Sequence, residues 1–187
     1  MLLDIDRAAL VLIDVQEKLA AVMHDKETLL KGLHKIVAGA KVLNIPIIWN
    51  EQNPDRMGPT VEALREILLP AQPIAKMSFG CCGSEPFMTA LKKIQRDQLL
   101  IAGIEAHVCV YQTAAQLIEN DYHVQVVVDA VSSRNPSDTD IALQRITYAA
   151  TKHQAQLSPL TTSESALFEL MQTAEHPRFK QILKIIR

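Results

Sequence analysis

Three side chains that together could carry out nucleophilic chemistry follow strand-like segments of the sequence. Asp14 closes an apolar run, Lys76 closes a shorter one, and Cys109 comes six residues after the glycine that ends a third. In a parallel α/β sheet, ligands bind beyond the carboxyl ends of the strands, near the point where the strand order reverses. The spacing therefore predicts an acid, a cation and a thiol at one sheet edge, which is a nucleophile with its base and its electrostatic partner.

The Cys109 thiol is predicted to lie near the start of a helix, where unpaired backbone N–H groups and the helix dipole stabilise an anion. With a cation such as Lys76 nearby, a cysteine in this position can ionise well below its free pKa of about 8.5. Asp14 can take the thiol proton and later give it to a leaving amine. Each residue also has an ordinary alternative: a buried structural cysteine, an aspartate that caps a turn, or a surface lysine. Their convergence at one edge favours the catalytic interpretation.

Strand-like and helix-like segments alternate along the chain, which is typical of a parallel sheet covered by helices on both faces. The first apolar run has no polar alternation, as expected for a strand buried on both sides. A polar segment at 50–59 is predicted to be a loop beside the pocket. Strands are predicted at residues 8–13, 45–49, 73–76, 98–102, 124–128 and 154–157, and helices at 26–43, 60–69, 85–96, 107–120, 137–151 and 163–171, before an amphipathic tail at 179–186.

Right-handed crossovers between six such strands most often give the order 3-2-1-4-5-6, with the switch point between strands one and four. We therefore predict an α/β fold with three α/β/α layers and a six-stranded parallel sheet, formed by residues 1–187 as one domain. Asp14 and Cys109 would flank the switch point, and Lys76 would reach it from strand three. Position beside this edge also predicts a substrate-binding role for Phe79, Trp49, Asn50 and Tyr111.

Composition and charge exclude several classes of function. A net charge of −2 and a pI near 6.3 offer no basic footprint for nucleic acid or an anionic membrane. No apolar run approaches the roughly 20 residues that span a bilayer, and the first residues lack the basic region and apolar core of a signal peptide. Three cysteines do not make a disulfide framework. We therefore predict a cytoplasmic protein that acts on a small-molecule substrate, without nucleic-acid or membrane partners.

Other reactive residues give weaker signals. Adjacent Cys81 and Cys82 are poorly placed to bridge one another and have no Cys or His pair at zinc-like spacing, which favours apolar packing. The six histidines are scattered; His107 is a candidate pocket residue, with a structural role at the helix start as the alternative. No glycine follows the first strand, so neither a P-loop nor a dinucleotide-binding turn is present. The sequence predicts no metal and no cofactor.

Four segments of the chain resemble the isochorismatase-like hydrolases, the cysteine hydrolase superfamily that includes nicotinamidases and N-carbamoylsarcosine amidohydrolases. The resemblance covers roughly residues 8–165. Each segment alone is modest, but their order and spacing together are specific. The segments are Leu12-Ile13-Asp14-Val15-Gln16, Lys76-Met77-Ser78-Phe79, Gly103-Ile104-Glu105-Ala106-His107-Val108-Cys109-Val110 and Val128-Asp129-Ala130-Val131-Ser132-Ser133.

The resemblance implies the same triad of Asp14, Lys76 and Cys109. It also implies a cis peptide bond between Ile104 and Glu105, which would turn the Glu105 N–H toward the Cys109 N–H to form an oxyanion hole. The implied reaction is acyl transfer, in which the thiol attacks an amide-type carbonyl, Asp14 protonates the departing amine, and water cleaves the thioester. Members of this superfamily are usually oligomers, so a homo-oligomer is expected.

Two departures narrow the implied reaction. Nicotinamidases carry a metal-binding Asp and His set after the second strand, whereas this chain has Trp49-Asn50-Glu51-Gln52-Asn53-Pro54, so zinc and nicotinamide are not expected. Isochorismatases cleave a vinyl ether and typically lack the cysteine, so Cys109 argues against that reaction. The leading hypothesis is a metal-independent cysteine hydrolase that cleaves a small amide or related C–N bond. The alternatives are a ligand-binding protein without turnover, a nicotinamidase-type amidase, and a thiol redox protein that uses the three cysteines.

Overall fold

The computed structural model describes residues 1–155 and 157–187, and within them six strands form one all-parallel sheet. The strand order is β3-β2-β1-β4-β5-β6, which confirms the predicted order and places the switch point between β1 and β4. The strands are β1 (Ala8–Ile13), β2 (Ile47–Gln52), β3 (Ile74–Lys76), β4 (Gln98–Ile104), β5 (His123–Ser132) and β6 (Leu160–Thr161).

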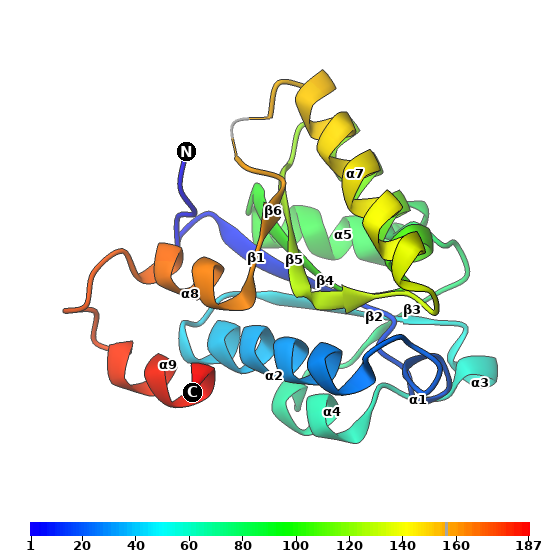
Figure 1. The fold of residues 1–187 in the computed structure, drawn as a ribbon, viewed down its shortest axis with the longest axis horizontal. Helices are drawn as coiled ribbons and strands as arrows, with labels where there is room; N and C mark the ends of the chain where they lie inside the picture. Colours follow the sequence, from blue (N-terminus) through cyan, green and yellow to red (C-terminus); the bar gives the residue numbers. More distant parts are fainter. Residues whose placement is uncertain (156) are drawn as a thin grey trace.

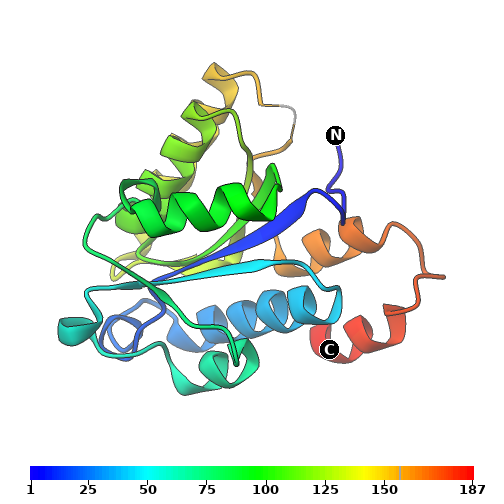
Figure 2. The same cartoon turned by 180° about the vertical axis from the view of Figure 1, so that it is seen from behind.

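Helices cover both faces of the sheet, which confirms the three α/β/α layers (Figure 1 and Figure 2). One face carries α2 (Lys26–Val42), α4 (Glu62–Leu68), α8 (Ser163–Met171) and α9 (Phe179–Ile186). The other face carries α5 (Glu85–Ile94), α6 (Tyr111–Glu119) and α7 (Pro136–Lys152). Shorter elements lie in the connections: α1 (Glu17–Ala20), α3 (Pro54–Met57), the 3₁₀ turn η1 (Cys81–Gly83) and the π-helical segment η2 (Ala106–Val110).

Side chains that alternate along each strand divide the apolar residues into two clusters, one on each face of the sheet. In β1, Leu10 and Leu12 pack in the cluster of α2, whereas Val11 and Ile13 pack in the cluster of α6. Every residue of β1 is fully buried, as its unbroken apolar sequence predicts. Because burial on both faces fixes the register of β1, the residue that follows it is held at a defined point on the carboxyl edge.

Strand β2 runs three residues further than predicted, and the predicted loop at 50–59 starts correspondingly later. Hydrogen bonds from polar side chains stabilise this extension of β2, because they take the place of water molecules that would bind the backbone of a loop. The Asn50 side chain donates to the Leu12 carbonyl oxygen at 3.1 Å. The Gln16 amide accepts from the Gln52 backbone N–H at 2.7 Å and donates to the Gln52 carbonyl at 3.0 Å. Strand β2 therefore carries polar residues to the same sheet edge as β1 and β3.

The sixth strand lies at Leu160–Thr161, so its predicted position at 154–157 was wrong, and residue 156 of that range lies outside the described residues. The chain that leaves α7 first folds back as a helix cap. The Ala155 N–H donates to the Ala150 carbonyl at 2.9 Å. Because this N–H caps the end of α7, it is not available for the hydrogen bonds of a strand.

The segment after β4 begins with a wide helical turn, where the sequence predicted one helix over 107–120. The Val110 N–H donates to the Glu105 carbonyl at 3.2 Å, a span of five residues, and the regular helix α6 starts only afterwards. Cys109 lies inside this first turn. The peptide bond that joins Ile104 to Glu105 at the end of β4 is cis.

A substitution at Gly32 can test how tightly α2 packs on the sheet. A Cβ at this position would overlap the backbone carbonyl of Asp129 in β5, which cannot move without disturbing the strand. We expect Gly32→Ala to lower the free energy of unfolding by about 1–3 kcal/mol net, although alanine favours a helix interior by about 1 kcal/mol. Urea unfolding followed by circular dichroism measures the change.

Gly39→Ala is the matched control in the same helix. The three atoms nearest to its Cβ would all belong to the side chain of Leu167, which can move more easily than backbone, so a smaller loss is expected. Equal losses in the two variants, or a gain in Gly32→Ala, would contradict the packing explanation.

Candidate functional site

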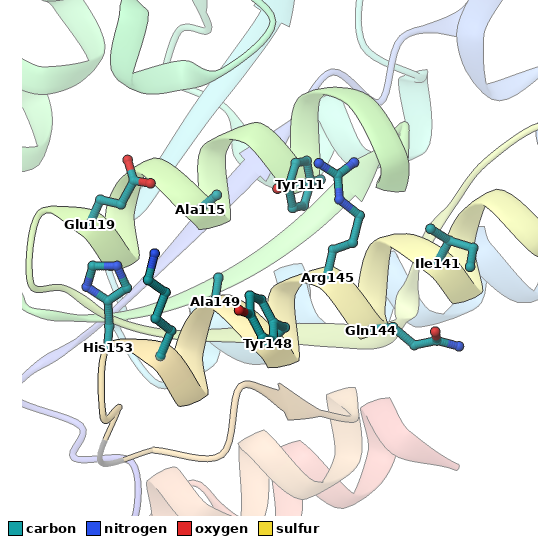
Figure 3. A pocket seen from close by; sticks show the side chains of 10 residues that line it. Tyr111, Ala115, Glu119, Ile141, Gln144, Arg145, Tyr148, Ala149 and His153 are labelled. Carbon is teal, nitrogen blue, oxygen red and sulfur yellow. The ribbon is translucent and has the colours of Figure 1, made fainter.

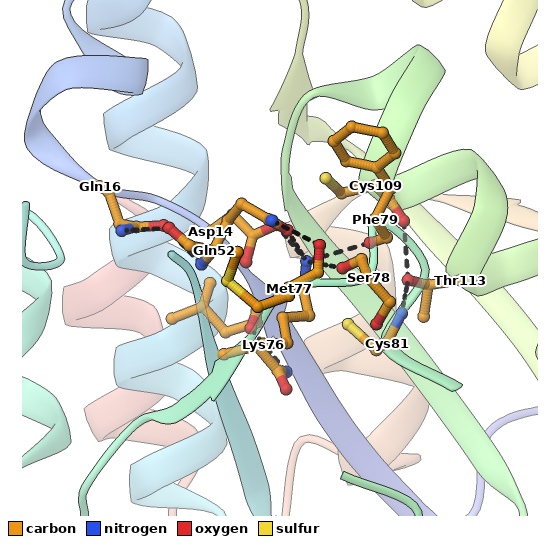
Figure 4. A network of polar contacts seen from close by, with 12 residues as sticks. Asp14, Gln16, Gln52, Lys76, Met77, Ser78, Phe79, Cys81, Cys109 and Thr113 are labelled. Carbon is orange, nitrogen blue, oxygen red and sulfur yellow. Dashed lines mark hydrogen bonds and ion pairs between the residues drawn. The ribbon is translucent and has the colours of Figure 1, made fainter. Parts of the chain in front are cut away.

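The structure brings Asp14, Lys76 and Cys109 to one buried corner of the carboxyl edge (Figure 4). Asp14 follows β1 with a φ of 54°, a left-handed conformation that few non-glycine residues adopt. Lys76 ends β3, and its Nζ donates to Asp14 Oδ2 at 2.7 Å across β2. Both of these side chains are completely buried, and Cys109 in η2 is 6% exposed.

The Lys76 ammonium is surrounded by acceptors on every side. Besides Asp14, the Gln52 side chain accepts from Nζ through Oε1 at 2.8 Å. The backbone carbonyls of Phe79 and Ser78 accept at 3.0 and 3.2 Å. An ammonium has three N–H bonds, so four acceptors satisfy it fully. The charge is therefore fixed at one point and needs no water.

Two amide side chains extend the hydrogen bonding of the sheet beyond β1 and β2. Gln16 is fully buried and holds the backbone of Gln52 at both its N–H and its carbonyl. Gln52 in turn donates through Nε2 to the Met77 carbonyl at 2.9 Å. Sequence reasoning missed Gln52 as a site residue because it ended strand two at Trp49, and it included Gln16 only as part of a motif. With the true end of β2, the rule that selected Asp14 and Lys76 also selects Gln52.

The Asp14 carboxyl presents two different oxygens. Oδ2 binds Lys76, whereas Oδ1 is buried and accepts no hydrogen bond of standard geometry from the described residues. Burial raises the pKa of Asp14 above its ordinary value, while the Lys76 charge and hydrogen bonding with the Cys109 thiol oppose that rise. Oδ1 is therefore the oxygen that remains available to accept a proton from the thiol.

Burial raises the pKa of the Cys109 thiol above its ordinary value. The Asp14 carboxylate raises this pKa further, and the Lys76 charge lowers it by less. The expectation of a depressed pKa at this cysteine was wrong, because Asp14 already neutralises the Lys76 cation and the helix start is shielded from water. The thiol rests protonated and needs a base before it can act as a nucleophile.

The other two cysteines are free, as Cys109 is, and burial dominates their chemistry. Burial raises the pKa of Cys81 to about 12 and that of Cys82 to about 11. The Cys81 N–H donates to Thr113 Oγ1 at 2.9 Å, and this hydroxyl donates to the Cys109 carbonyl at 2.7 Å. Thr113 therefore ties the loop that carries Cys81 to the turn that carries Cys109.

Two of the predicted substrate-binding residues lie on the side of the thiol. Asn50 is fully buried two residues after Ile48, whose side chain packs in the same cluster as Cys109, and its Oδ1 has no partner among the described residues. Phe79 is 55% exposed and lies beside the network around Lys76 (Figure 4). Both positions fit a substrate that approaches the thiol from this edge.

The structure does not bring Trp49 and Tyr111 to the thiol. Alternation along β2 sends Trp49 to the opposite face of the sheet, where its Nε1 donates to Thr60 Oγ1 at 2.7 Å. The Tyr111 ring lies 3.8 Å from the Arg145 guanidinium and lines a groove of about 570 Å³ between α6 and α7 (Figure 3). Tyr111 is the first residue of α6, and its ring faces this groove (Figure 3).

Side chains tie η2 to the end of β5. The exposed Arg134 donates through Nε to the Glu105 carboxylate at 3.0 Å. His107 Nδ1 lies 2.9 Å from Ser133 Oγ, which gives His107 a structural contact. These contacts fix the backbone of the turn in which Cys109 lies.

Neither a metal-ligand cluster nor a membrane span occurs in the described part of the chain. No three side chains of His, Cys, Asp or Glu in residues 1–155 and 157–187 gather as metal ligands would. Within the same residues, every helix is too short or too polar to cross a bilayer.

Comparison with protein families and relatives places this chain among known proteins. A family model for the isochorismatase domain matches residues 8–164. The secreted isochorismatase effector Isc1 of Phytophthora sojae (strain P6497) is 35% identical over 178 residues, which cover 93% of this chain and 81% of the relative. Isochorismatase domain-containing protein 2 of Danio rerio is 34% identical over 180 residues, which cover 96% of this chain and 86% of the relative.

Solved structures agree with this placement. The MAR1 ribonuclease of Caenorhabditis elegans superposes with a TM-score of 0.88 at 35% identity, covering 100% of this chain and 92% of its own. YcaC of Pseudomonas aeruginosa, solved with hexane-2,5-diol and covalent acrylamide, gives 0.89 at 29% identity, with 98% and 91% coverage. Escherichia coli YcaC, described as an octameric hydrolase of unknown specificity, gives 0.85 at 26% identity, with 98% and 95% coverage.

The buried ion pair yields a stability prediction. Lys76→Met removes the cation and leaves the Asp14 carboxylate buried without its partner, so we expect the free energy of unfolding to fall by about 3–5 kcal/mol at pH 7. Without the cation the pKa of Asp14 rises further. The deficit should therefore shrink as the pH is lowered and the carboxyl takes up a proton. Urea unfolding at several pH values measures both effects.

Two further variants serve as controls. Arg65→Met breaks an exposed ion pair with Glu62 and should cost less than about 1 kcal/mol. Adding Asp14→Asn to Lys76→Met removes the stranded charge and should recover much of the lost stability. A Lys76→Met deficit that matches the Arg65 control, or that grows at low pH, would contradict the buried-pair explanation.

Proposed function

The chain belongs to the isochorismatase family, and on that premise we propose that it is a cysteine hydrolase that cleaves a small amide or related C–N bond without a metal ion. Family membership supports a hydrolase. One observation carries the finer proposal: a buried thiol lies beside a carboxyl whose Oδ2 is held by a lysine and whose Oδ1 accepts no hydrogen bond of standard geometry from the described residues. That arrangement suits a nucleophile whose base is ready to accept one proton.

In the first half of the reaction, Cys109 is the nucleophile and Asp14 is the base. The sulfur attacks the amide carbonyl carbon while the thiol proton moves to Asp14 Oδ1. The tetrahedral intermediate then collapses, the C–N bond breaks, and Asp14 returns the proton to the leaving nitrogen. Lys76 keeps its charge throughout, which stabilises the carboxylate before and after each transfer. An amine leaves, and a thioester on Cys109 remains.

In the second half, water replaces the amine. Asp14 takes a proton from the water as its oxygen attacks the thioester carbonyl, and the C–S bond breaks. The departing sulfur then takes the proton back from Asp14. The carboxylic acid leaves, and thiol and carboxylate return to their resting forms. No oxidant, reductant or metal enters this balance.

The backbone N–H groups of Glu105 and Cys109 are proposed to form the oxyanion hole. The position of Cys109 supports this proposal. The first hydrogen bond of η2 that spans five residues is donated by the N–H of Val110, and Cys109 precedes Val110. N–H groups at this point of a helix lack an intrahelical partner. One donor of this kind is worth about 10²–10³ in rate.

A relative supports the reactivity proposed for the thiol. Acrylamide, which is covalently bound in the YcaC structure from Pseudomonas aeruginosa, is a small amide with an electrophilic double bond. We propose that Cys109 is the residue of this chain that would react with it. The sulfur would bond to the terminal carbon, and the thiol proton, passed through Asp14, would end on the carbon beside the carbonyl.

The remaining properties are proposed by analogy. A homo-oligomer is supported by the octameric YcaC of Escherichia coli. A small-molecule substrate agrees with the slight exposure of Cys109. The cytoplasmic location stays a prediction, since one relative is named as a secreted effector. The absence of a nucleic-acid partner stays one too, since another is named as a ribonuclease.

The proposed nucleophile is tested by a panel of small amides and ureido compounds. We expect Cys109→Ala to abolish turnover, because no other group can form the thioester, while circular dichroism stays unchanged. Cys82→Ala is the matched control and should keep wild-type rates, because Cys82 lies outside the cluster of charges. Release of ammonia or amine measures turnover.

Other outcomes would favour other functions. Turnover that survives in Cys109→Ala would reject the hydrolase mechanism. A panel compound that binds tightly and is never converted would favour a ligand-binding protein. RNA cleavage by the wild-type protein that persists in Cys109→Ala would favour the activity for which the Caenorhabditis elegans neighbour is named.

The proposed base is tested by the pH dependence of Cys109 alkylation with iodoacetamide. Because the pKa of Asp14 is raised by burial, its carboxylate is protonated at a higher pH than that of an ordinary aspartate, so the acid limb of the profile, where the alkylation rate falls, should lie at a higher pH than the titration of an ordinary aspartate. Asp14→Asn should remove that limb, and because it also leaves the Lys76 charge unopposed beside the thiol, the readout is the shape of the pH profile and not the rate at one pH. Peptide mass mapping assigns the label, and an acid limb that persists unchanged in Asp14→Asn would exclude Asp14 as the base.

A further inference from the structure

Gln52 contacts the cation of the cluster, yet no step of the proposed hydrolysis uses it. Its Oε1 accepts from Lys76 Nζ at 2.8 Å, almost as short as the 2.7 Å contact from Nζ to Asp14 Oδ2. These are the two side-chain acceptors of the ammonium that the described residues supply. The Gln52 amide oxygen is neutral and adds no charge to the ion pair of Asp14 and Lys76. Its effect is therefore to orient the Lys76 ammonium.

The direction of the ammonium decides which oxygen of Asp14 is free. Electrostatic attraction alone favours a lysine placed between both carboxyl oxygens, where it would also block Oδ1. Four acceptors share the three N–H bonds of Lys76, so the carbonyls of the adjacent Ser78 and Phe79 divide one N–H between them, Gln52 accepts a second, and Oδ1 is left without a partner of standard geometry among the described residues. An acceptor opposite the carboxylate therefore keeps the ammonium on Oδ2.

Gln52 is itself held in place, as a positioning group must be. Its own Nε2 donates to the Met77 carbonyl at 2.9 Å, which fixes the orientation of the amide. Its backbone is bound on both sides by the buried Gln16 amide. Two independent anchors thus set where Oε1 lies relative to Lys76.

We propose that Gln52 is a positioning residue that holds the Lys76 ammonium on Asp14 Oδ2 and so leaves Oδ1 open to receive the Cys109 proton. This inference rests on the proposed function, because it takes Asp14 as the base. Gln52 does not touch the reacting atoms. Its contribution acts through Lys76 and should appear in the rate and pH dependence of thiol activation.

Several charged or titratable groups face Asp14 and enter its pH dependence. Lys76 faces it from β3, Glu51 from β2, Cys109 from η2, and Cys81 from η1. Replacing Gln52 by a group without an acceptor changes none of these charges. It frees one N–H of Lys76 to turn toward Oδ1, which stabilises the carboxylate and occupies its open oxygen.

The test compares iodoacetamide alkylation of Cys109 in wild-type protein and in Gln52→Met, which keeps the chain length and replaces the amide oxygen by a thioether sulfur, a much weaker acceptor. We expect the plateau rate to fall about tenfold, since the base is partly blocked, and the acid limb to move toward lower pH. A merely structural role would loosen the ion pair and move the limb toward higher pH. Peptide mass mapping separates Cys109 from Cys81 and Cys82.

A second variant keeps the inference testable if Gln52→Met does not fold. Gln52→Glu retains an acceptor oxygen but adds a negative charge that competes for Lys76, so the limb should move toward higher pH, opposite to Gln52→Met. Gln181→Met, at an exposed position of α9, is the control for the exchange itself and should change nothing.

Each result decides between the two proposals. Wild-type rate and limb in a folded Gln52 variant, or limbs that move in the same direction in both variants, would overturn the role of Gln52. Alkylation needs no substrate, so a protein that hydrolyses no amide but shows the opposite shifts would retain the positioning role and reject only the hydrolase proposal.

Discussion

The buried ion pair between Asp14 and Lys76 is the interaction on which the rest of the site depends. Neither side chain has any exposed surface, and taking two charges out of water costs several kcal/mol per ion unless hydrogen bonds replace the lost hydration. The chain meets this requirement with acceptors from three neighbouring elements. Gln52 at the end of β2 and the carbonyls after β3 complete the shell of Lys76. The carboxyl edge of the sheet is therefore organised around one ammonium group.

The same pair determines the chemistry open to the thiol. A lone cation beside Cys109 would lower the pKa of the thiol and favour the thiolate. A cation already paired with a carboxylate has a much smaller effect, because the two opposite charges largely cancel at the sulfur. The thiol consequently rests as a neutral group, with a pKa raised by burial. A resting thiol reacts slowly with oxidants and electrophiles, since the thiolate is the reactive form. In the proposed mechanism, the thiol is therefore activated only when Asp14 takes its proton.

How far the sequence predicts this molecule depends on whether a feature follows from strand order or from side-chain direction. The unbroken apolar strands and the rule of the carboxyl edge predicted the sheet order and brought Asp14, Lys76 and Cys109 together. Trp49 and Tyr111 were chosen by nearness along the chain, but alternation in β2 sends Trp49 to the opposite face, and the Tyr111 ring packs against Arg145 of α7. The single domain over 1–187 stays a prediction.

The protonation state of the Cys109 thiol could not be predicted from the sequence. The pKa of a thiol is a balance between burial and two opposite charges, and spacing says nothing about which charge is nearer. The structure leaves Asn50 Oδ1 without a partner among the described residues, and this atom is an acceptor. An unpaired buried acceptor costs about 1–3 kcal/mol, which a ligand with N–H donors relieves and an ester cannot. The proposed amide or ureido substrate carries such donors, so the unpaired acceptor of Asn50 supports the proposal that the bond cleaved is a C–N bond and not that of an ester.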